Sequence, residues 1–399
     1  MTALNEEEAN KSPRVAILSL RNVDSHVPRA CGYEFEDVIK SELDSARVLA
    51  PKHKGFSSQA LKAKGWLSRY VNVADGLGLG TESETLDQDY DLFFYSIARP
   101  RDLNYLSEIK GWRKRSRFAV CWLQELWIED IPRLGKVLNQ LNKFDHVICP
   151  FYHTTEPLRE RLSVPVTYLP WGVDTELFCP YPKPPLRAID VFNIGDVSPV
   201  SHDALVDYAD KSGKFYLYNT IHGRHSMASH KDHRHNYAGT LKRSKYFLSY
   251  LAKVARTSER GSQQEFGLRY IEGIAAGTIL LGNRVPNLAF EEYFGWPGSV
   301  IEVPYGSPNI SDVIDQLEAK PRQTEAIRKN NVIQSLTRHD HLHRWEKVLE
   351  IAGLEQLPKM AERRAKLAKL AALVEKTGDA ASHKPKQPAS PTGQVGGNL

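Results

Sequence analysis

The chain has 399 residues, of which 41% are hydrophobic and 25% are charged, and its net charge is +5. This length favours two domains over one, and the composition is that of a globular protein with a large core. It contains no run of about 18 apolar residues, which argues against a transmembrane helix. The polar, acidic N-terminus lacks the apolar stretch of a secretory signal. The four scattered cysteines fit neither a zinc site nor a disulfide framework, so we expect reduced thiols in a cytoplasmic protein.

The first half of the chain alternates between strand and helix patterns. Residues 1–12 are expected to form a disordered tail. Apolar runs of strand length then occur at 14–20, 46–51, 89–97, 115–127, 144–151 and 164–170. Segments with helical spacing separate them, for example 33–43, 131–143 and 154–162. Continuous apolar strands alternating with helices predict a parallel sheet that is covered on both faces.

A proline-rich joint and a second alternating series follow. Four prolines between Pro180 and Pro185 predict a linker. Strands are then expected at 190–196, 214–219, 246–252 and 298–304, and helices at 202–213, 239–245, 310–319 and 322–335. A histidine-rich loop is expected over 222–237. The second half therefore predicts another parallel sheet between helices.

These patterns predict an α/β protein with two Rossmann-like, doubly wound domains that face each other across a cleft. The N-terminal domain is expected to span 13–180 and the C-terminal domain 181–335. A closing helix is expected at 336–356, a basic helix at 357–379 and a disordered tail at 380–399.

The stretch 263–283, QQEFGLRYIEGIAAGTILLGN, is the strongest candidate for a binding site. Gly267 is expected to allow a tight turn before a helix that starts near Leu268. The free amides at that helix start suit a phosphate. Arg269 can grip a diphosphate bidentately, and Glu272, one turn on, can accept two hydrogen bonds from a ribose diol. The alternative interpretation is an ordinary surface pair of Arg and Glu.

This stretch resembles the donor-binding signature of GT-B glycosyltransferases of group 1, and in particular the subset related to the CgeB spore-maturation proteins. The matching residues in that subset's pattern are Arg269, Glu272, Ala275, Gly277 and the segment 285–288. The segment 144–178 resembles the end of the N-terminal domain of such enzymes, with the signature residues Pro170, Gly172, Val173, Asp174 and Phe178. The resemblance implies the GT-B fold, with an acceptor domain at 13–180 and a nucleotide-sugar domain at 181–335.

The resemblance also implies a position for the catalytic groups. Retaining members of the group usually carry two glutamates seven residues apart, and the first would fall at Gln264, with Glu265 one place away. Gln264 keeps a hydrogen bond to the transferred sugar but supplies no charge. Either Glu265 takes this place through a local shift, or the donor differs, or the activity is weak. Glu125, at the end of the strand 115–127, is the candidate general base of an inverting mechanism. A surface glutamate is the alternative.

Further residues are expected at the cleft because they follow strands or neighbour them. Gly195, Asn219, His222 and Lys242 are predicted to contact the donor, with Lys242 neutralising phosphate. Gln124 and His26 are predicted to contact the acceptor. An ordinary turn or a solvated basic helix would explain Gly195 and Lys242 equally simply.

The histidine-rich loop at 222–237 and the basic helix at 357–379 each allow two interpretations. The loop 222–237 holds five histidines, but their spacing fixes no metal site and no metal is expected. A mobile polar loop over the cleft is the preferred interpretation. The basic helix carries an apolar stripe of Met360, Leu367, Leu370 and Val374. This stripe either docks on a lipid surface or packs on the protein's own domains.

We therefore predict a cytoplasmic glycosyltransferase, either free or peripheral at the inner membrane face, that moves a sugar from a nucleoside diphosphate donor to a hydroxyl of a glycan, lipid-linked or small-molecule acceptor. Retention of configuration is expected, and no cofactor beyond the nucleotide-sugar co-substrate and no nucleic acid partner are expected. The alternatives are a nucleotide-sugar 2-epimerase of the same fold and a non-enzymatic basic protein that binds RNA or a membrane. A dinucleotide-dependent dehydrogenase is disfavoured because no G-x-G-x-x-G follows the strand at 14–20.

Overall fold

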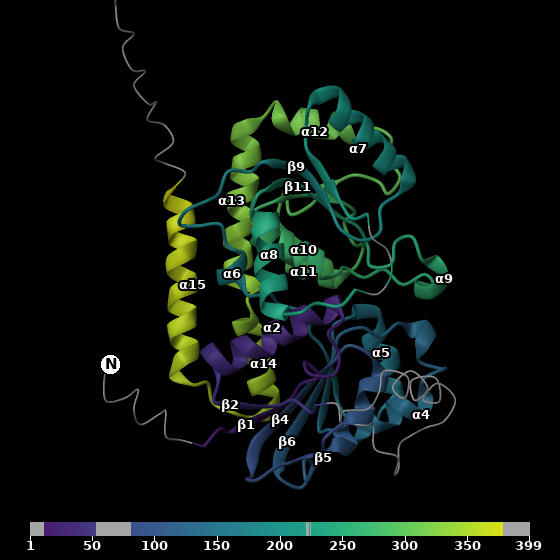
Figure 1. The fold of residues 1–399 in the computed structure, drawn as a ribbon, viewed down its shortest axis with the longest axis vertical. Coiled ribbons are helices and arrows are strands. Elements are labelled where there is room, and N and C mark those ends of the chain that lie inside the picture. Colours follow the sequence, from purple (N-terminus) through teal and green to yellow (C-terminus); the bar gives the residue numbers. More distant parts are fainter. Residues whose placement is uncertain (1–11, 53–80, 221–222, 224, 378–399) are drawn as a thin grey trace, which may run out of the picture.

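The computed structural model describes residues 12–52, 81–220, 223 and 225–377. The predicted tail at 380–399 and nearly all of the tail at 1–12 lie outside these residues. The described chain forms two parallel sheets, one above the other in Figure 1, each flanked by helices. A long C-terminal helix runs along one side of both layers.

The first sheet has six parallel strands in the order β2-β1-β4-β6-β7-β8. The strands are β1 (Val15–Leu18), β2 (Ala46–Leu49), β4 (Tyr90–Ile97), β6 (Ser116–Leu123), β7 (His146–Cys149) and β8 (Val166–Tyr168). In the central register, Tyr95 of β4 lies between Leu18 of β1 and Cys121 of β6. All three are buried, as expected for strands that helices cover on both faces.

The helices of the first domain are short. They are α2 (Ala30–Val38), continued by the π turn η2 (Ile39–Leu43), α4 (Gly135–Leu138) and α5 (Tyr152–Arg161), with 3-10 turns η1 (Val27–Arg29), η3 (Pro100–Glu108), η4 (Ile128–Asp130) and η5 (Asn139–Lys143). A small separate ladder pairs β3 (Glu84–Thr85) with β5 (Ile109–Lys110). The predicted helix at 131–143 is wrong in type, because most of it is irregular or 3-10.

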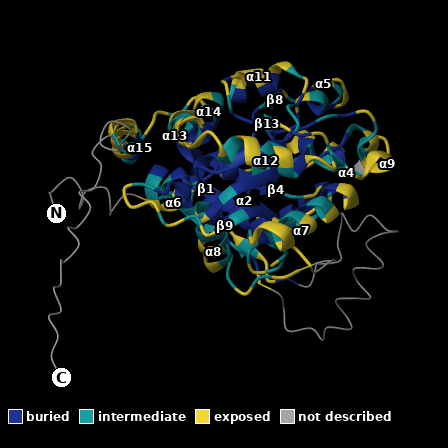
Figure 2. Cartoon of the chain, turned by 90° about the horizontal axis from the view of Figure 1, so that it is seen from above, coloured by how far each residue is buried: buried dark blue, intermediate teal, exposed yellow. Residues whose placement is uncertain are grey.

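The second sheet has five parallel strands in the order β10-β9-β11-β12-β13. They are β9 (Ile189–Asn193), β10 (Tyr216–Tyr218), β11 (Ser244–Ser249), β12 (Ile279–Gly282) and β13 (Ile301–Glu302). The helices of this half are α6 (Thr175–Phe178), α7 (Pro199–Ser212), α8 (His230–Lys242), α9 (Thr257–Arg260), α10 (Leu268–Ala275), α11 (Leu288–Phe294), α12 (Ile310–Glu318) and α13 (Pro321–Arg338). Figure 2 shows the strands at the buried centre, whereas α7, α11 and α12 expose their outer faces.

Helix α8 corrects the predicted loop at 222–237, because residues from His230 onward are helical. Ser229 begins the helix by accepting a hydrogen bond from the amide of Asp232. The buried face consists of Arg234, Ala238 and Leu241, which are spaced as one side of a helix. Arg234 stands at a position of the buried face where an amphipathic helix normally has an apolar residue. The apolar spacing in the sequence therefore did not indicate this helix.

The chain returns to the first domain at its end. Helix α14 (His341–Ala352) packs on β6 and η2 of the first domain. Trp345 Nε1 donates to Asp44 Oδ2, just after η2, at 2.9 Å, and the ring of His341 stacks on Phe35 of α2. Helix α15 (Pro358–Lys376) then runs back along α13. Its buried Arg363 binds Asp340, Asp174 and Glu42, so one side chain joins α14, α6 and η2.

The carboxyl ends of the two sheets face each other. Glu125, which follows β6, pairs with Lys253, which follows β11, at 3.1 Å between Oε1 and Nζ. The amide of Val27, after β1, donates to the carbonyl of His225, after β10. Loops at the carboxyl ends of both sheets therefore meet. Two helix-covered parallel sheets in this arrangement form the GT-B fold that the sequence predicted.

Candidate functional site

Gly195 and Arg269 lie against each other at the carboxyl edge of the second sheet. Gly195 follows β9 and has a φ of 86°, a conformation that favours glycine. A Cβ built on it would lie 2.3 Å from Nη2 of Arg269. The absence of a side chain at Gly195 thus allows the guanidinium to approach the backbone. The structure brings together two residues that the sequence analysis selected separately.

Arg269 is in the first turn of α10 and is partly exposed. Within the described part of the chain, its guanidinium has no hydrogen bond and no ion pair to a protein group. A cation at a helix N-terminus gains nothing from the helix dipole. The Arg269 side chain therefore lies at the positive end of the dipole of α10, and no anionic group of the described residues neutralises it.

The start of α10 is open. No side chain of Gly267, its N-cap residue, can cap the first amides. The prediction that Gly267 serves a tight turn is wrong, because its φ of −106° suits any residue. Apart from its neighbours in the chain, no described atom would lie within 4 Å of a Cβ at Gly267, so space lies beside this backbone. Free amides, an unpaired guanidinium and open space together suit an anion.

Two buried polar atoms lie at the ends of strands β9 and β11. Asn193 Oδ1 and Ser249 Oγ have no hydrogen-bond partner among the described residues, and both side chains are almost fully buried. Asn193 is two residues before Gly195. A buried polar atom without a partner is costly and needs an explanation. The Ser249 hydroxyl can donate to an anion at this edge, whereas Asn193 Oδ1 is an acceptor and needs a donor.

Glu272 differs from Arg269, although one helical turn separates them. Its side chain is buried. Oε1 accepts from Arg234 Nη1 at 2.5 Å and Oε2 accepts from the Tyr237 hydroxyl at 3.2 Å. Residues three apart on an α-helix differ in direction by about 60°, which is enough to turn one side chain into the core and leave the other at the surface. The sequence predicted that both side chains are open to a ligand, but in this structure only Arg269 is open and Glu272 is buried.

Arg234 and Glu34 complete the surroundings of Glu272, and the sequence analysis selected neither. Arg234 Nε donates to Glu34 Oε2 at 2.7 Å, so a guanidinium of α8 bridges α2 of the first domain and α10 of the second. Burial alone would raise the pKa of Glu34. The charge of Arg234 and the hydrogen bond from His341 outweigh this effect and lower the pKa to about 2. One feature of the sequence could have identified Arg234. It has helical spacing with Ala238 and Leu241 and follows the N-cap residue Ser229.

The residues before α10 dock on the first domain. Glu265 is buried and accepts from the amides of Tyr152 and His153 at 3.0 and 2.9 Å, the first turn of α5. The hydrogen bond from His153 to this carboxylate raises the pKa of His153. Glu265 thus caps a helix of the other domain, which does not fit the expectation that it shifts to the reaction centre. Gln264 is partly exposed, and its carbonyl accepts from Asn287.

The first-domain candidates are engaged with protein groups. Glu125 Oε1 accepts from Trp127 Nε1 at 2.5 Å and pairs with Lys253. Lys253 also pairs with Glu259, and its ammonium lies 4.8 Å from the centre of the Trp127 ring. Lys253 has a φ of 53°. A left-handed backbone conformation at a bulky residue is strained and persists only where neighbouring groups stabilise it. Here the contacts with Glu125, Glu259 and Trp127 stabilise it.

Gln124 and His26 lie in the same region of the first domain. Gln124 Nε2 donates to Ser96 Oγ at 3.0 Å and fills the space beside Gly32, where a Cβ would lie 2.3 Å from it. His26 pairs through its backbone with Ser226 of the second domain. Asn219 follows β10 and makes contacts within the protein. His222 lies outside the described residues.

Lys242 corrects another prediction. It ends α8 and immediately precedes β11, so it lies at the amino edge of the second sheet, opposite to Gly195. Its Nζ donates to the carbonyl of Leu177 at 2.9 Å. A residue at this edge cannot neutralise a phosphate at the carboxyl edge. The sequence placed Lys242 near a strand but could not distinguish the two ends.

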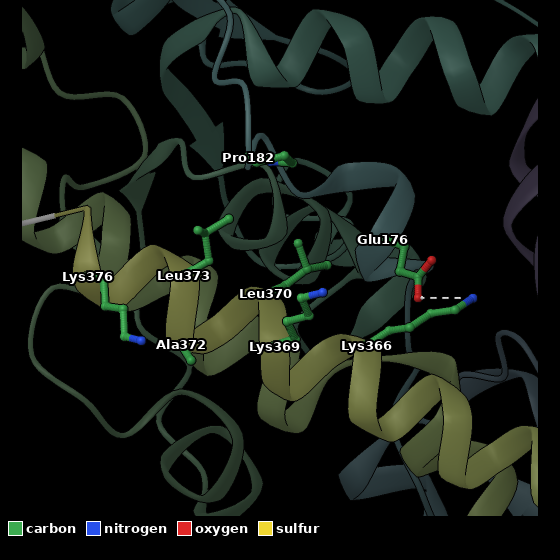
Figure 3. A pocket seen from close by; sticks show the side chains of 8 residues that line it. All are labelled: Glu176, Pro182, Lys366, Lys369, Leu370, Ala372, Leu373 and Lys376. Carbon is green, nitrogen blue, oxygen red and sulfur yellow. Dashed lines mark ion pairs between the residues drawn. The ribbon is translucent and has the colours of Figure 1, made fainter.

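The apolar stripe of α15 faces the protein. Met360, Leu367 and Val374 are buried and Leu370 is partly buried. This burial supports the interpretation of a helix packed on its own domains, and the stripe is not an exposed lipid-binding face. A groove of about 620 Å³ runs along α15, where Leu370 and Leu373 point toward Pro182 and the lysines 366, 369 and 376 border it (Figure 3). None of its lining residues belongs to the candidate site.

The four cysteines are buried and form no disulfide. Among the described residues, no cluster of three or more histidines, cysteines or acidic residues is arranged to hold a metal ion. None of the helices in the described ranges is both long and apolar enough to cross a bilayer.

The fold defines a GT-B type protein, in which Gly195, Arg269 and the uncapped start of α10 meet at the carboxyl edge of the second sheet. Residues 205–350 match the family model described as Glycosyl transferase-like. The match includes α8 and α10 and thus Arg234, Arg269 and Glu272. No curated protein sequence matches the chain closely enough to be called a relative.

Several solved structures are similar at low identity. TarM is 12% identical with a TM-score of 0.41; the similarity covers 65% of this chain, which spans only about half of TarM (54%). HepE (Alr3699) of Anabaena, in complex with UDP-glucose, is 12% identical over 85% of this chain and 99% of its own, with a TM-score of 0.47. AviGT4, a glycosyltransferase involved in avilamycin A biosynthesis, is 12% identical over 90% and 98%, with a TM-score of 0.42.

Proposed function

We propose that this protein is a glycosyltransferase that moves a sugar from a nucleoside diphosphate donor to an acceptor hydroxyl, with retention of configuration. The observation that carries the proposal is the meeting of Gly195, Arg269 and the uncapped start of α10. The family match over residues 205–350 supports the same reaction class.

The donor diphosphate would bind at this edge of the second domain. Its oxygens would accept hydrogen bonds from the Arg269 guanidinium and from the first amides of α10, while Gly195 allows the close approach of the backbone. Negative charge grows on the diphosphate as the bond to the sugar breaks. Fixed positive groups at this place stabilise that charge without having to reorganise.

The acceptor would approach from the first domain, whose strand ends face this site. In a retaining reaction, the bond between the anomeric carbon and the diphosphate oxygen breaks, and the acceptor oxygen forms its bond to that carbon on the same face. The acceptor proton passes to the departing phosphate, so no protein base is needed. This chemistry agrees with Glu125 being engaged by Lys253 and Trp127. Holding both substrates together supplies much of the rate enhancement.

Gln264 and Glu272 take supporting roles in the proposal. Gln264 stands where related retaining enzymes usually carry a glutamate, and its amide can hydrogen-bond the transferred sugar without adding charge. Glu272 would accept from the ribose hydroxyls once its carboxylate turns from Arg234 toward the ligand. Each carboxylate oxygen has a second lone pair, so a partial turn is sufficient.

A thermal-shift screen with UDP, GDP, ADP and dTDP tests the donor class, because a ligand that binds only the native state raises the melting temperature. We expect one of these to stabilise the wild-type protein and to lose this effect in Arg269→Ala. Turnover is then measured with the corresponding sugar donor, alone and with a panel of glycosides. Nucleotide release that requires a glycoside supports transfer. Sugar isomerisation with donor alone would indicate a 2-epimerase, and no stabilisation by any nucleotide would contradict the proposal.

A further inference from the structure

Arg234 is a buried cation shared by two carboxylates from different domains. Its side chain is 5% exposed. It donates to Glu34 through Nε and Nη2 at 2.7 and 3.3 Å, and to Glu272 through Nη1 at 2.5 Å. The rings of Phe178 and Tyr237 lie 4.8 and 5.7 Å from the guanidinium carbon. The guanidinium is therefore fixed in place by groups on several elements.

Glu34 is itself held firmly. It accepts from His341 Nε2 at 3.1 Å and from the amide of Asp174 at 3.1 Å. If Glu272 turned toward a ligand, Arg234 would keep its pair with Glu34. No unpaired charge would be left in the core, which is the usual cost of breaking a buried ion pair.

We propose that Arg234 is a positioning residue for Glu272, and that Glu34 allows Arg234 to release Glu272 to the ligand. The proposal rests on the proposed function, because it gives Glu272 the ribose hydroxyls of the donor. According to this proposal, the Glu34 carboxylate of the first domain determines how readily the second domain binds the ribose. Arg234 itself does not touch the substrate.

Removal of the guanidinium has a consequence for protonation. Without Arg234, Glu272 is a buried carboxylate with no cation bonded to it, and burial favours its neutral form. Among the described residues, the titratable groups that interact with it besides Arg234 are Cys31 on α2 and His233 and Tyr237 on α8, and Glu34 lies on the other side of Arg234. In Arg234→Met, a protonated Glu272 accepts ribose hydroxyls less well. Nucleotide affinity should therefore fall as the pH is lowered from 8 to 6.

The test is calorimetric titration of the full chain with UDP, or with whichever of GDP, ADP and dTDP stabilises the protein most. The variants are Arg234→Met, Arg234→Lys and Glu34→Gln. We expect at least tenfold weaker binding in Arg234→Met, with a further loss of about threefold or more from pH 8 to pH 6. Arg234→Lys should recover part of the affinity and abolish this added pH dependence. Glu34→Gln should weaken binding about three- to tenfold, because Arg234 then depends on Glu272 alone.

The matched control is Arg363→Met, because Arg363 is equally buried and also joins the two domains, but contacts Asp340, Asp174 and Glu42 instead of Glu272. Its nucleotide affinity should stay within about twofold of wild type wherever the variant remains folded. Inorganic pyrophosphate, which has no ribose, should compete equally well in wild type and Arg234→Lys.

The outcomes separate the two proposals. If wild type binds no nucleotide, the proposed function fails. If wild type binds and Arg269→Ala does not, but Arg234→Met matches Arg363→Met in affinity and in pH profile, the positioning role of Arg234 is wrong. If Arg234→Met does not fold, Arg234→Lys and Glu34→Gln decide. Wild-type affinity in both would overturn the proposal.

Discussion

The carboxyl edges of the two sheets are built alike but are used differently. At the first edge, Gln124 is bound to Ser96, and Glu125 is bound to Lys253 and Trp127. At the second edge, Arg269 has no hydrogen bond or ion pair within the described residues, and the start of α10 is uncapped. In the proposed function, the unpaired positive groups of the second edge would bind the donor diphosphate. The first edge is bonded to the second domain through Glu125 and Lys253, and it would face the acceptor.

Of the changes at the second edge, replacement of Arg269 should lower the nucleotide affinity most. Arg269→Ala removes a charge-assisted contact to the diphosphate, typically about 1–3 kcal/mol, and should weaken nucleotide binding about 5–150-fold. Calorimetric titration measures the effect. Lys242→Ala is the control, because Lys242 lies at the opposite edge of the same sheet and should leave the affinity unchanged. Equal losses in both variants would show that positive charge in general, rather than this site, binds the nucleotide.

Acid should weaken the junction between the edges. The pKa of Glu34 is lowered to about 2 in the folded protein, so its contribution to stability is complete above the unfolded value near 4.5 and is lost as the pH falls toward 2. The contribution is on the order of 3 kcal/mol. Urea unfolding of wild type and Glu34→Gln at pH 7 to 3 tests it. We expect the variant to lose less stability over the acid range, and parallel curves would contradict the role of this carboxylate.

A methyl group at Gly195 should disturb the second edge in two ways. Gly195→Ala strains the backbone by about 1–2 kcal/mol and pushes the Arg269 guanidinium away. We expect a lower free energy of unfolding and several-fold weaker nucleotide binding. Gly213→Ala is the matched control, because Gly213 also has a positive φ of 66° but has no atom within 4 Å of its built Cβ. It should lose stability without losing affinity.

The smallest effect is expected at the first edge. In a retaining reaction, Glu125→Gln should lower turnover less than tenfold, since the departing phosphate takes the proton. General-base catalysis typically contributes about 10²- to 10⁴-fold. Steady-state turnover with a saturating donor measures it. A loss of a hundredfold or more would make Glu125 the base of an inverting enzyme.

The sequence was sufficient for the parts of the fold that depend on local pattern. The run from Leu92 to Tyr95 predicted a strand buried on both faces, and β4 is that strand. Helix α10 begins at Leu268, as predicted from Gly267 and the residues after it. Such features follow from periodicity within one segment.

The remaining features depend on partners far away in the chain. Glu265 caps a helix more than a hundred residues earlier, and Arg234 pairs with Glu34 two hundred residues earlier. No local pattern identifies such a partner. The sequence could select Arg269 and Glu272 together, but only the packing of α8 decides that one is open and the other is buried.

A crystal structure of the protein with the stabilising nucleoside diphosphate would test the central claim most directly. We predict that the phosphate oxygens contact the Arg269 guanidinium and the first amides of α10, next to Gly195. Phosphates bound at another surface, with Arg269 and the start of α10 unoccupied, would contradict the account.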